Sequence, residues 1–318
     1  MNFCRLVYAM FFIIIYFVLL LFVKKSNKKQ KPIKKIFIYW EQGWNEAPTV
    51  CKYCLESWKL YNVDWKIIEL DKNNLFEYLD ISYEKQFQNI QPVQMRSDII
   101  RINLLKKYGG IWVDATTFCT TPLNSWILKQ KTFFAFSSPG KDRMISSWFM
   151  TNVYKNSFII NKFCDDVNSY WEVMISKNQY KAKQYFQFHY IFNKLYKKYY
   201  KFRSEWDNVN NKIEASQGHY IIENPNQFKN VPPHVKEHID LFKSPLYKLN
   251  HYCSHRVENL TLNNNYTYLV KKHLVVPKIK GPIHNKYLIV GSAPYIKVWV
   301  EKHLQWFVDN EYINYTLQ

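Results

Sequence analysis

The stretch SDIIRINLLKKYGGIWVDATT places an acid, a base and a second acid around a pair of glycines. Asp98 and Arg101 are three residues apart, so they share one face if the segment is helical. Gly109 and Gly110 favour a sharp turn from that helix into a strand that ends at Asp114. Because the turn brings the strand back beside the helix, we expect the three charged side chains to converge.

Spacing alone does not identify a reaction for this group. A salt bridge on a helix surface, followed by an aspartate at the end of a strand, would give the same pattern. Only 7 of the 318 residues are glycine, however, so two adjacent glycines indicate a backbone requirement. The sharp helix-to-strand turn would be that requirement.

The elements around this stretch follow an alternating pattern. A strand is expected at KKIFIYW, a helix at TVCKYCLESWKL after Pro48, and a second strand at DWKIIEL. A helix from Pro92 to Tyr108 and the strand IWVD continue the series, which places Asp114 at a carboxyl end. Such βαβ units predict a parallel sheet covered on both faces, with ligands bound beyond the carboxyl ends of the strands.

The first part of the chain contains an apolar, uncharged run, LVYAMFFIIIYFVLLLFV, at residues 6–23. At about 1.5 Å per helical residue it is just long enough to span a bilayer core of roughly 30 Å. We expect a transmembrane anchor; the alternatives are a cleaved signal peptide and a buried core helix. The lysines that follow favour a cytoplasmic catalytic domain on a single-pass membrane protein, and the alternative is a lumenal type II orientation in a Golgi-like compartment.

These patterns predict an N-terminal anchor, a basic tether and one large domain whose second half is rich in aromatic residues. The segment KQYFQFHYIFNKLYKKYYKF in that half is typical of an amphipathic helix. The predicted boundaries are 1–25 for the anchor, 26–32 for the tether and 33–318 for the domain, which divides into parts 33–150 and 151–318.

The formal net charge of +19 raises nucleic acid as a partner, but much of it comes from the lysine run after residue 23. No nucleic-acid-binding motif accompanies that charge, so no nucleic acid is expected as a partner. A basic nucleic-acid-binding membrane protein stays a less favoured alternative. The six cysteines are too scattered for a disulfide framework.

The stretch from Ser97 to Thr117 closely resembles the DXD-type sugar-nucleotide glycosyltransferases, whose pattern runs S-D-x-x-R, an apolar helix, G-G, an aromatic residue and a metal-binding acid. More closely, the chain resembles the capsular polysaccharide synthesis protein family. The segments that carry this resemblance are FIYWEQGWNEAPTV, LESWKL, GGIWVDATTFCTTPL, SSWF and YFQFHYIF, across roughly residues 33–250.

The resemblance implies an α/β fold of GT-A type, with a Rossmann-like, mostly parallel sheet flanked by helices. It makes 33–150 the nucleotide-sugar-binding part of the domain and 151–318 the acceptor or helical part. It also implies a nucleotide-sugar donor whose diphosphate binds a divalent cation, Mn²⁺ or Mg²⁺, held by the acidic motif. A leaving nucleoside diphosphate gains negative charge as its bond to the sugar breaks, and such a cation stabilises that charge. The chain departs from the DXD pattern, because Thr116 stands where the second acid would be and leaves Asp114 as the carboxylate ligand.

Individual roles follow from position in the family's motif and from residue type. Asp98 and Arg101 match residues that contact the donor's ribose and sugar hydroxyls. Trp40, Trp44 and Trp148 are candidates to stack on a base or sugar, Lys248 to offset diphosphate charge, and His189 and His251 to act as bases or further ligands. The predicted set is catalytic Asp114 and Arg101, donor-binding Asp98, Arg101, Gly109, Gly110, Trp40, Trp148 and Lys248, and metal-binding Asp114 and Thr116.

The function expected from this reading is that of a membrane-anchored glycosyltransferase. It would transfer a sugar from a nucleotide-sugar donor to a glycan or lipid-linked acceptor, in surface or capsular polysaccharide biosynthesis. The missing second acid at Thr116 motivates one alternative, an inactive membrane scaffold that keeps the glycosyltransferase fold.

Overall fold

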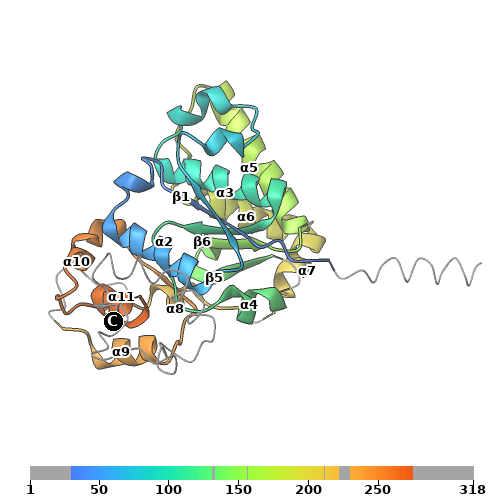
Figure 1. Ribbon diagram of the computed structural model, residues 1–318. Coiled ribbons are helices and arrows are strands. Elements are labelled where there is room, and N and C mark those ends of the chain that lie inside the picture. Colours follow the sequence, from blue (N-terminus) through green and yellow to red (C-terminus); the bar gives the residue numbers. More distant parts are fainter. Residues whose placement is uncertain (1–29, 131–132, 156, 211, 222–229, 275–318) are drawn as a thin grey trace, which may run out of the picture. The chain divides into compact units, whose positions relative to one another are not determined.

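The computed structural model describes residues 30–130, 133–155, 157–210, 212–221 and 230–274 (Figure 1). From Ile33 onward these residues belong to one compact unit, which is the subject of the following paragraphs. The division of the chain into an anchor, a tether and two parts of one domain stays a prediction.

A five-stranded sheet with the order β2-β1-β3-β6-β5 forms the centre of this unit. Its strands are β1 (Lys35–Tyr39), β2 (Lys66–Leu70), β3 (Gly110–Asp114), β5 (Phe134–Gly140) and β6 (Arg143–Asn152). In β1, Tyr39 is paired with Leu70 of β2 on one side and with Asp114 of β3 on the other, both in parallel. The carboxyl ends of these three strands therefore meet at one edge of the sheet.

The first half of the unit has the predicted βαβ pattern. Helix α2 (Thr49–Tyr61) follows β1, and helix α3 (Val93–Tyr108) precedes β3. Because β2 and β3 lie on opposite sides of β1, two crossovers of the same hand place their helices on opposite faces of the sheet. Figure 1 shows α2 and α3 on opposite faces. These helices and strands confirm the local predictions for this half of the chain.

The glycine pair makes the predicted turn between α3 and β3. Gly109 and Gly110 have φ angles of +72° and +88°, which side chains with a Cβ rarely adopt. A Cβ on Gly110 would also lie 2.6 Å from the carbonyl oxygen of Lys35 in the neighbouring strand. Both the conformation and the close approach of β1 therefore require glycine here.

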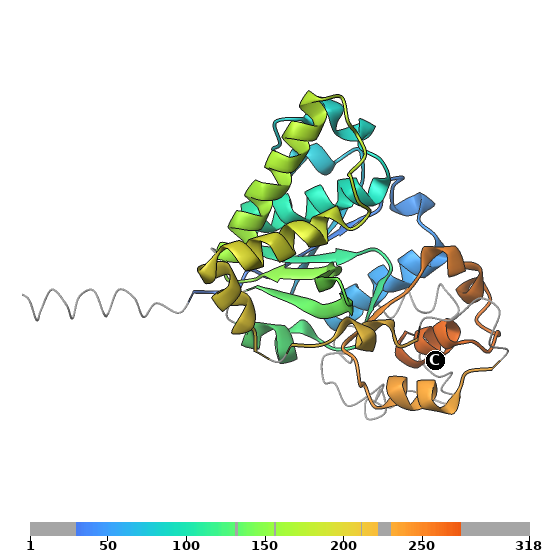
Figure 2. The same cartoon turned by 180° about the vertical axis from the view of Figure 1, so that it is seen from behind.

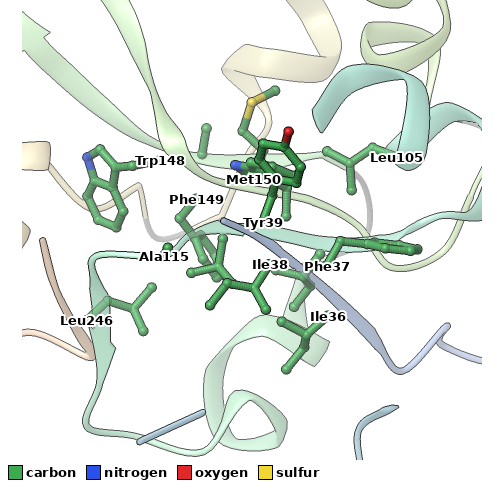
Figure 3. Packing of buried hydrophobic residues seen from close by; sticks show 14 of the residues in the cluster. Ile36, Phe37, Ile38, Tyr39, Leu105, Ala115, Trp148, Phe149, Met150 and Leu246 are labelled. Atoms are coloured by element: carbon green, nitrogen blue, oxygen red, sulfur yellow. The ribbon is translucent and has the colours of Figure 1, made fainter. Parts of the chain in front are cut away.

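Strand β1 is buried on both faces. Ile36, Phe37 and Ile38 are 0% exposed, although successive side chains of a strand point to opposite faces. Figure 3 shows these side chains in the core, together with Leu105 from α3 and Phe149 from β6. Full burial of side chains of this size stabilises the folded state by roughly 1.5–3 kcal/mol each. The position of β1 is therefore well fixed, and so is the start of the segment that follows it.

The middle of the chain adds an antiparallel hairpin and three helices. Strands β5 and β6 are joined through Lys141 and Asp142. The helices are α5 (Phe158–Ser176), α6 (Gln187–Lys198) and α7 (Tyr200–Asp207), and α5 packs on α3. Figure 2 shows α5 and α6, coloured yellow-green to olive, on the same face of the sheet as α3. The amphipathic segment predicted as one helix forms two, because Tyr199 between α6 and α7 is extended.

The last described segments are held to the end of β3 by a second, two-stranded sheet. In it, β4 (Thr117–Cys119) pairs antiparallel with β7 (Leu246–Lys248). This pairing places Lys248 opposite Thr117, three residues after Asp114. The other helices of the described chain are α4 (Leu123–Trp126), α8 (Ala215–His219), α9 (Pro233–Asp240), α10 (His255–Glu258) and α11 (Asn265–His273).

The predicted fold class is wrong in two respects. The sheet is mixed rather than mostly parallel, because β6 runs antiparallel to β3 and β5 antiparallel to β6. The physical reason is the short connection between β5 and β6, since strands joined by two residues can only pair antiparallel.

The second respect concerns the membrane. No helix among the described residues has the length and apolar character needed to cross a bilayer. This finding contradicts the expected transmembrane helix, the single-pass membrane location and the cytoplasmic side assigned to the catalytic domain. Those expectations rested on the hydropathy of residues 6–23, and that segment lies outside the described residues.

Candidate functional site

A pocket of about 630 Å³ opens at the edge of the sheet where β1 and β3 end. Its lining comes from the end of β1 with the residues after it, the first half of α3, and the end of β3 with the residues after it. The start of β6, Pro139 of β5, the segment before α6 with His189, His219 of α8, and β7 with the residues after it complete the lining. A pocket beyond the carboxyl ends of parallel strands is the usual ligand site of α/β sheets. The position predicted for Asp114 is therefore at the pocket.

One side of the pocket carries Asp98, Arg101, Asp114 and Lys248, which we call the charged wall. Arg101 lies between the two acids: its Nη1 donates a hydrogen bond to Asp98 Oδ1, and its Nη2 lies 3.0 Å from Asp114 Oδ1. The indole Nε1 of Trp112 donates to the same Asp114 oxygen at 2.9 Å. The predicted convergence of Asp98, Arg101 and Asp114 is thus present.

The two acids of the charged wall have different electrostatic environments. Burial would raise the pKa of Asp114, but Arg101 and Lys248, with the Trp112 hydrogen bond, hold it below its usual value. Burial raises the pKa of Asp98 to about 7; Arg101 opposes this shift and the charge of Asp114 adds to it. Asp114 is consequently the permanent anion of the wall, and Asp98 changes its charge near neutral pH.

Lys248 reaches Asp114 from a distant part of the chain. Its Nζ lies 3.4 Å from Asp114 Oδ2 and donates a hydrogen bond to Thr116 Oγ1. The backbone N–H of Leu249 donates to the carbonyl of Thr116 at 2.7 Å, which fixes the strand that carries the lysine. The ammonium group of Lys248 therefore contacts both predicted metal ligands, Asp114 and Thr116.

These residues do not fit a metal site as they are arranged. Both oxygens of Asp114 have cationic or N–H partners, and a hard divalent cation prefers several oxygen ligands, carboxylates among them. Within the described ranges, no three His, Cys, Asp or Glu side chains are grouped so that they could hold a metal ion. The divalent cation stays a prediction that the donor set does not favour.

Aromatic side chains also line the pocket: Trp40, Trp148, Tyr185, Phe186 and His251, which together we call the aromatic wall. The ring of Trp148 packs against Phe136, with centroids 4.3 Å apart, and Trp40 makes an edge contact with His251 at 5.8 Å. The indole N–H groups of Trp40 and Trp148 are buried and have no hydrogen-bond partner among the described residues. Buried indole N–H groups usually have an acceptor, so these two are unsatisfied within the described residues.

The two predicted histidines also line the pocket, but neither lies within the charged wall. His189 is buried, and its pKa falls to about 3 through burial and then the charges of Arg101 and Arg143. Burial, followed by Lys248, also lowers the pKa of His251. Both imidazoles are therefore neutral at ordinary pH.

Three predicted residues lie elsewhere. Gly109 and Gly110 are at the opposite end of β3 from Asp114 and are not among the lining residues, so their donor-binding role stays a prediction. Trp44 likewise does not belong to the lining. Sequence reasoning missed Glu41, which lines the pocket and is held by Arg96, whose Nη2 lies 2.7 Å from Glu41 Oε2. Its position directly after β1 was the available signal.

Arg143, His219 and Tyr252 of the lining were also missed, and no pattern in the sequence pointed to them. Arg143 lies 3.7 Å from the centroid of the Phe186 ring and forms an ion pair with Asp142. These contacts join the β5–β6 turn to the segment before α6. Only the folded chain brings those segments together.

Comparison with known proteins gives two curated relatives. O-glycosyltransferase braB of Annulohypoxylon truncatum is 28% identical over 97 residues, which are 27% of this chain and 23% of the relative. O-glycosyltransferase PaGT of Phomopsis amygdali is 22% identical over 159 residues, 43% of this chain and 39% of the relative. The chain thus spans less than half the length of these relatives.

A solved structure, PaToxG Glycosyltransferase, aligns with 53% of this chain and 70% of its own, at 18% identity and a TM-score of 0.34. The family model described as "Capsular polysaccharide synthesis protein" matches residues 18–273, which is well over half of the chain. The match includes the charged wall and every segment from which the resemblance was inferred. The chain that carries this pocket is a member of the capsular polysaccharide synthesis protein family.

Proposed function

We propose that this chain is a glycosyltransferase that moves a sugar from a nucleotide-sugar donor to a glycan or lipid-linked acceptor in surface or capsular polysaccharide synthesis. The observation that carries the proposal is the convergence of Asp98, Arg101, Asp114 and Lys248 at one pocket wall. Family membership and the names of the curated relatives support the same class of enzyme.

The two walls suit the two ends of such a donor. The aromatic wall offers flat rings on which a base can stack. The charged wall offers fixed cations for a diphosphate and carboxylate oxygens for sugar hydroxyls. Asp98 Oδ2 accepts no hydrogen bond from the described residues, so it is available to a hydroxyl of the ligand.

In the transfer step, the bond between the sugar's anomeric carbon and the bridging oxygen of the diphosphate breaks, and its electron pair goes to that oxygen. A new bond forms from the acceptor hydroxyl to the anomeric carbon, and the hydroxyl proton passes to solvent. Asp114 would act by holding Arg101 and Lys248 in position beside the leaving group. Charges fixed before the reaction stabilise the developing diphosphate without reorganisation.

A donor panel tests this proposal. Purified protein is incubated with UDP-, GDP- and dTDP-linked sugars, and release of the nucleoside diphosphate to acceptor or water is measured. At least one donor should be consumed, and Asp114→Asn should lower that rate by about 10²- to 10³-fold, the usual effect of losing one preorganised charge contact.

The matched control is Asp165→Asn, which removes an acid of an exposed ion pair with Lys106 and should leave turnover unchanged. Melting curves of both variants show whether they are folded. If no donor of the panel is bound or consumed, or if folded Asp114→Asn turns over normally, the proposal fails. Binding of a donor without any turnover would instead favour the inactive scaffold.

A further inference from the structure

The two side chains that the sequence assigned to a metal ion meet a lysine instead. Lys248 Nζ lies 3.4 Å from Asp114 Oδ2 and donates a hydrogen bond to Thr116 Oγ1. A divalent ion bound by the same carboxylate and hydroxyl would have to lie where this ammonium lies. A monovalent cation of the chain itself therefore takes the place between the two groups.

The remaining oxygen of Asp114 is also engaged. Its Oδ1 accepts hydrogen bonds from Arg101 Nη2 at 3.0 Å and from Trp112 Nε1 at 2.9 Å. A metal ion at this carboxylate would have two cationic side chains as neighbours, and like charges at such distances repel. With Thr116 in place of a second acid, the site supplies one carboxylate where Mg²⁺ or Mn²⁺ needs an oxygen-rich shell.

The position of Lys248 is set by the backbone. In the β4–β7 sheet Lys248 is paired with Thr117, and the Leu249 N–H donates to the Thr116 carbonyl at 2.7 Å. The turn that carries Asp114 and Thr116 and the strand that carries Lys248 are thus hydrogen-bonded to each other. Only 20% of the lysine side chain is exposed, and the residue lines the pocket. The ammonium is therefore fixed before any ligand arrives, unlike that of a solvated surface lysine.

The charge of Lys248 also lowers the pKa of two histidines that line the pocket. Burial lowers the pKa of His219 to about 4, and the next largest cause is the charge of Lys248. His251 has a lowered pKa for the same two reasons. Both imidazoles are neutral, so among these three side chains Lys248 is the cation that can meet an anionic ligand.

We propose that Lys248, rather than a divalent metal ion, neutralises the diphosphate that leaves the donor, so that transfer by this chain is metal-independent. The inference rests on the proposed glycosyltransferase function. As the bond to the anomeric carbon breaks, the ammonium donates its remaining N–H to a diphosphate oxygen and stays protonated. The bonds broken and formed are those of the transfer step above.

The first experiment uses the wild-type protein after exhaustive dialysis against EDTA. Release of nucleoside diphosphate from the active donor is measured without added metal and with Mg²⁺ or Mn²⁺. The rates should agree within about twofold. Loss of the activity on EDTA treatment and its return with Mn²⁺ overturns the proposal, whatever the variants do.

The second experiment replaces the lysine. Lys248→Met should lower turnover by about 10²- to 10³-fold, as expected for the loss of a preorganised charge at the leaving group. Added Mn²⁺ should not restore it, and Lys248→Arg should keep more activity than Lys248→Met. The matched control is Lys243→Met, five residues earlier, whose exposed lysine pairs with Glu237. Normal turnover in a folded Lys248→Met protein overturns the proposal.

A third measurement does not depend on activity. Mn²⁺ alone is titrated into the metal-free wild-type protein, with binding followed by calorimetry and electron paramagnetic resonance. No saturable binding at micromolar concentrations is expected; saturable binding that disappears in Asp114→Asn overturns the proposal. If the wild-type protein consumes donor only when metal is present, this inference is refuted but the proposed function stands. If the protein neither binds nor consumes any donor, the proposed function is refuted as well.

Discussion

The charged wall and the aromatic wall of the pocket are built in different ways. Arg101 and Asp114 lie on α3 and β3, and the polar groups of their wall bind one another through short hydrogen bonds and ion pairs. Trp40 and Trp148 have buried indole N–H groups without partners among the described residues. The charged side chains are thus held in position by one another, while the two indoles are held by ring packing alone. Under the proposed function, the charged wall is positioned before the donor binds, and the aromatic wall contributes flat rings for the donor to contact.

The largest expected effect is on the free energy of unfolding, when the arginine at the centre of the charged wall is replaced. Arg101→Gln removes the guanidinium that both Asp98 and Asp114 contact and leaves two largely buried carboxyl groups with less compensation. Loss of one member of a buried ion pair typically costs about 3–5 kcal/mol. The free energy of unfolding, measured by urea denaturation, should fall by about that amount.

The matched control is the arginine beside the aromatic wall. Arg143 pairs with Asp142, whose side chain is 50% exposed, so Arg143→Gln should cost only about 1 kcal/mol. If the two variants lose similar amounts of stability, the ion pairs of Arg101 contribute no more to folding than the exposed ion pair of Arg143. The proposed difference between the two walls would then be wrong.

A second, smaller effect concerns the pH dependence of folding. The pKa of Asp98 is about 7 in the folded chain and about 3.9 in an unfolded one. Between these values the folded state holds a proton that the unfolded state lacks, so this contribution to stability is present at low pH and is lost as the pH rises toward 7. One proton changes the unfolding free energy by at most about 1.4 kcal/mol per pH unit.

Asp98→Asn should remove this dependence. Relative to wild type, the variant should gain stability as the pH rises from about 4 to 7, and the gain should level off above pH 7. Urea denaturation at a series of pH values measures the difference. A constant difference across the range would mean that Asp98 is already ionised, and that the charged wall holds two permanent anions.

The sequence allowed prediction of the part of the pocket in which neighbours in space are also neighbours in the chain. Asp98, Arg101 and Asp114 lie within one helix-turn-strand unit, whose geometry follows from the glycine pair and the periodicity of apolar residues. The same reasoning could have identified Glu41. This residue follows β1, and the last residue of β1 is paired with Asp114 at the end of β3.

The remaining parts depend on pairings between distant segments. The contact of Lys248 with Thr116 exists because β4 pairs with β7, and three-residue strands leave little periodicity to detect. The direction of β6 was missed for a related reason: a buried apolar run has the same composition whether its neighbour is parallel or antiparallel. Arg143 and His219 became neighbours of the pocket only through such pairings.

The smallest expected effect tests whether the aromatic wall binds the donor. A Cβ on Gly218 would lie 2.8 Å from Cη2 of Trp148, so Gly218→Ala must displace that ring. The glycine is in helix α8 without a positive φ, and alanine favours helix, so the fold should survive. An aromatic contact is worth about 0.5–1.5 kcal/mol, which predicts a loss of donor affinity of about 2- to 10-fold with kcat little changed.

Ser216→Ala, an exposed position of the same helix, is the matched control. The measurement is KM and kcat for the active donor, with a melting curve for each protein. A fall in kcat at constant KM would place Trp148 with the reacting groups, and unchanged kinetics in both variants would remove the aromatic wall from donor binding.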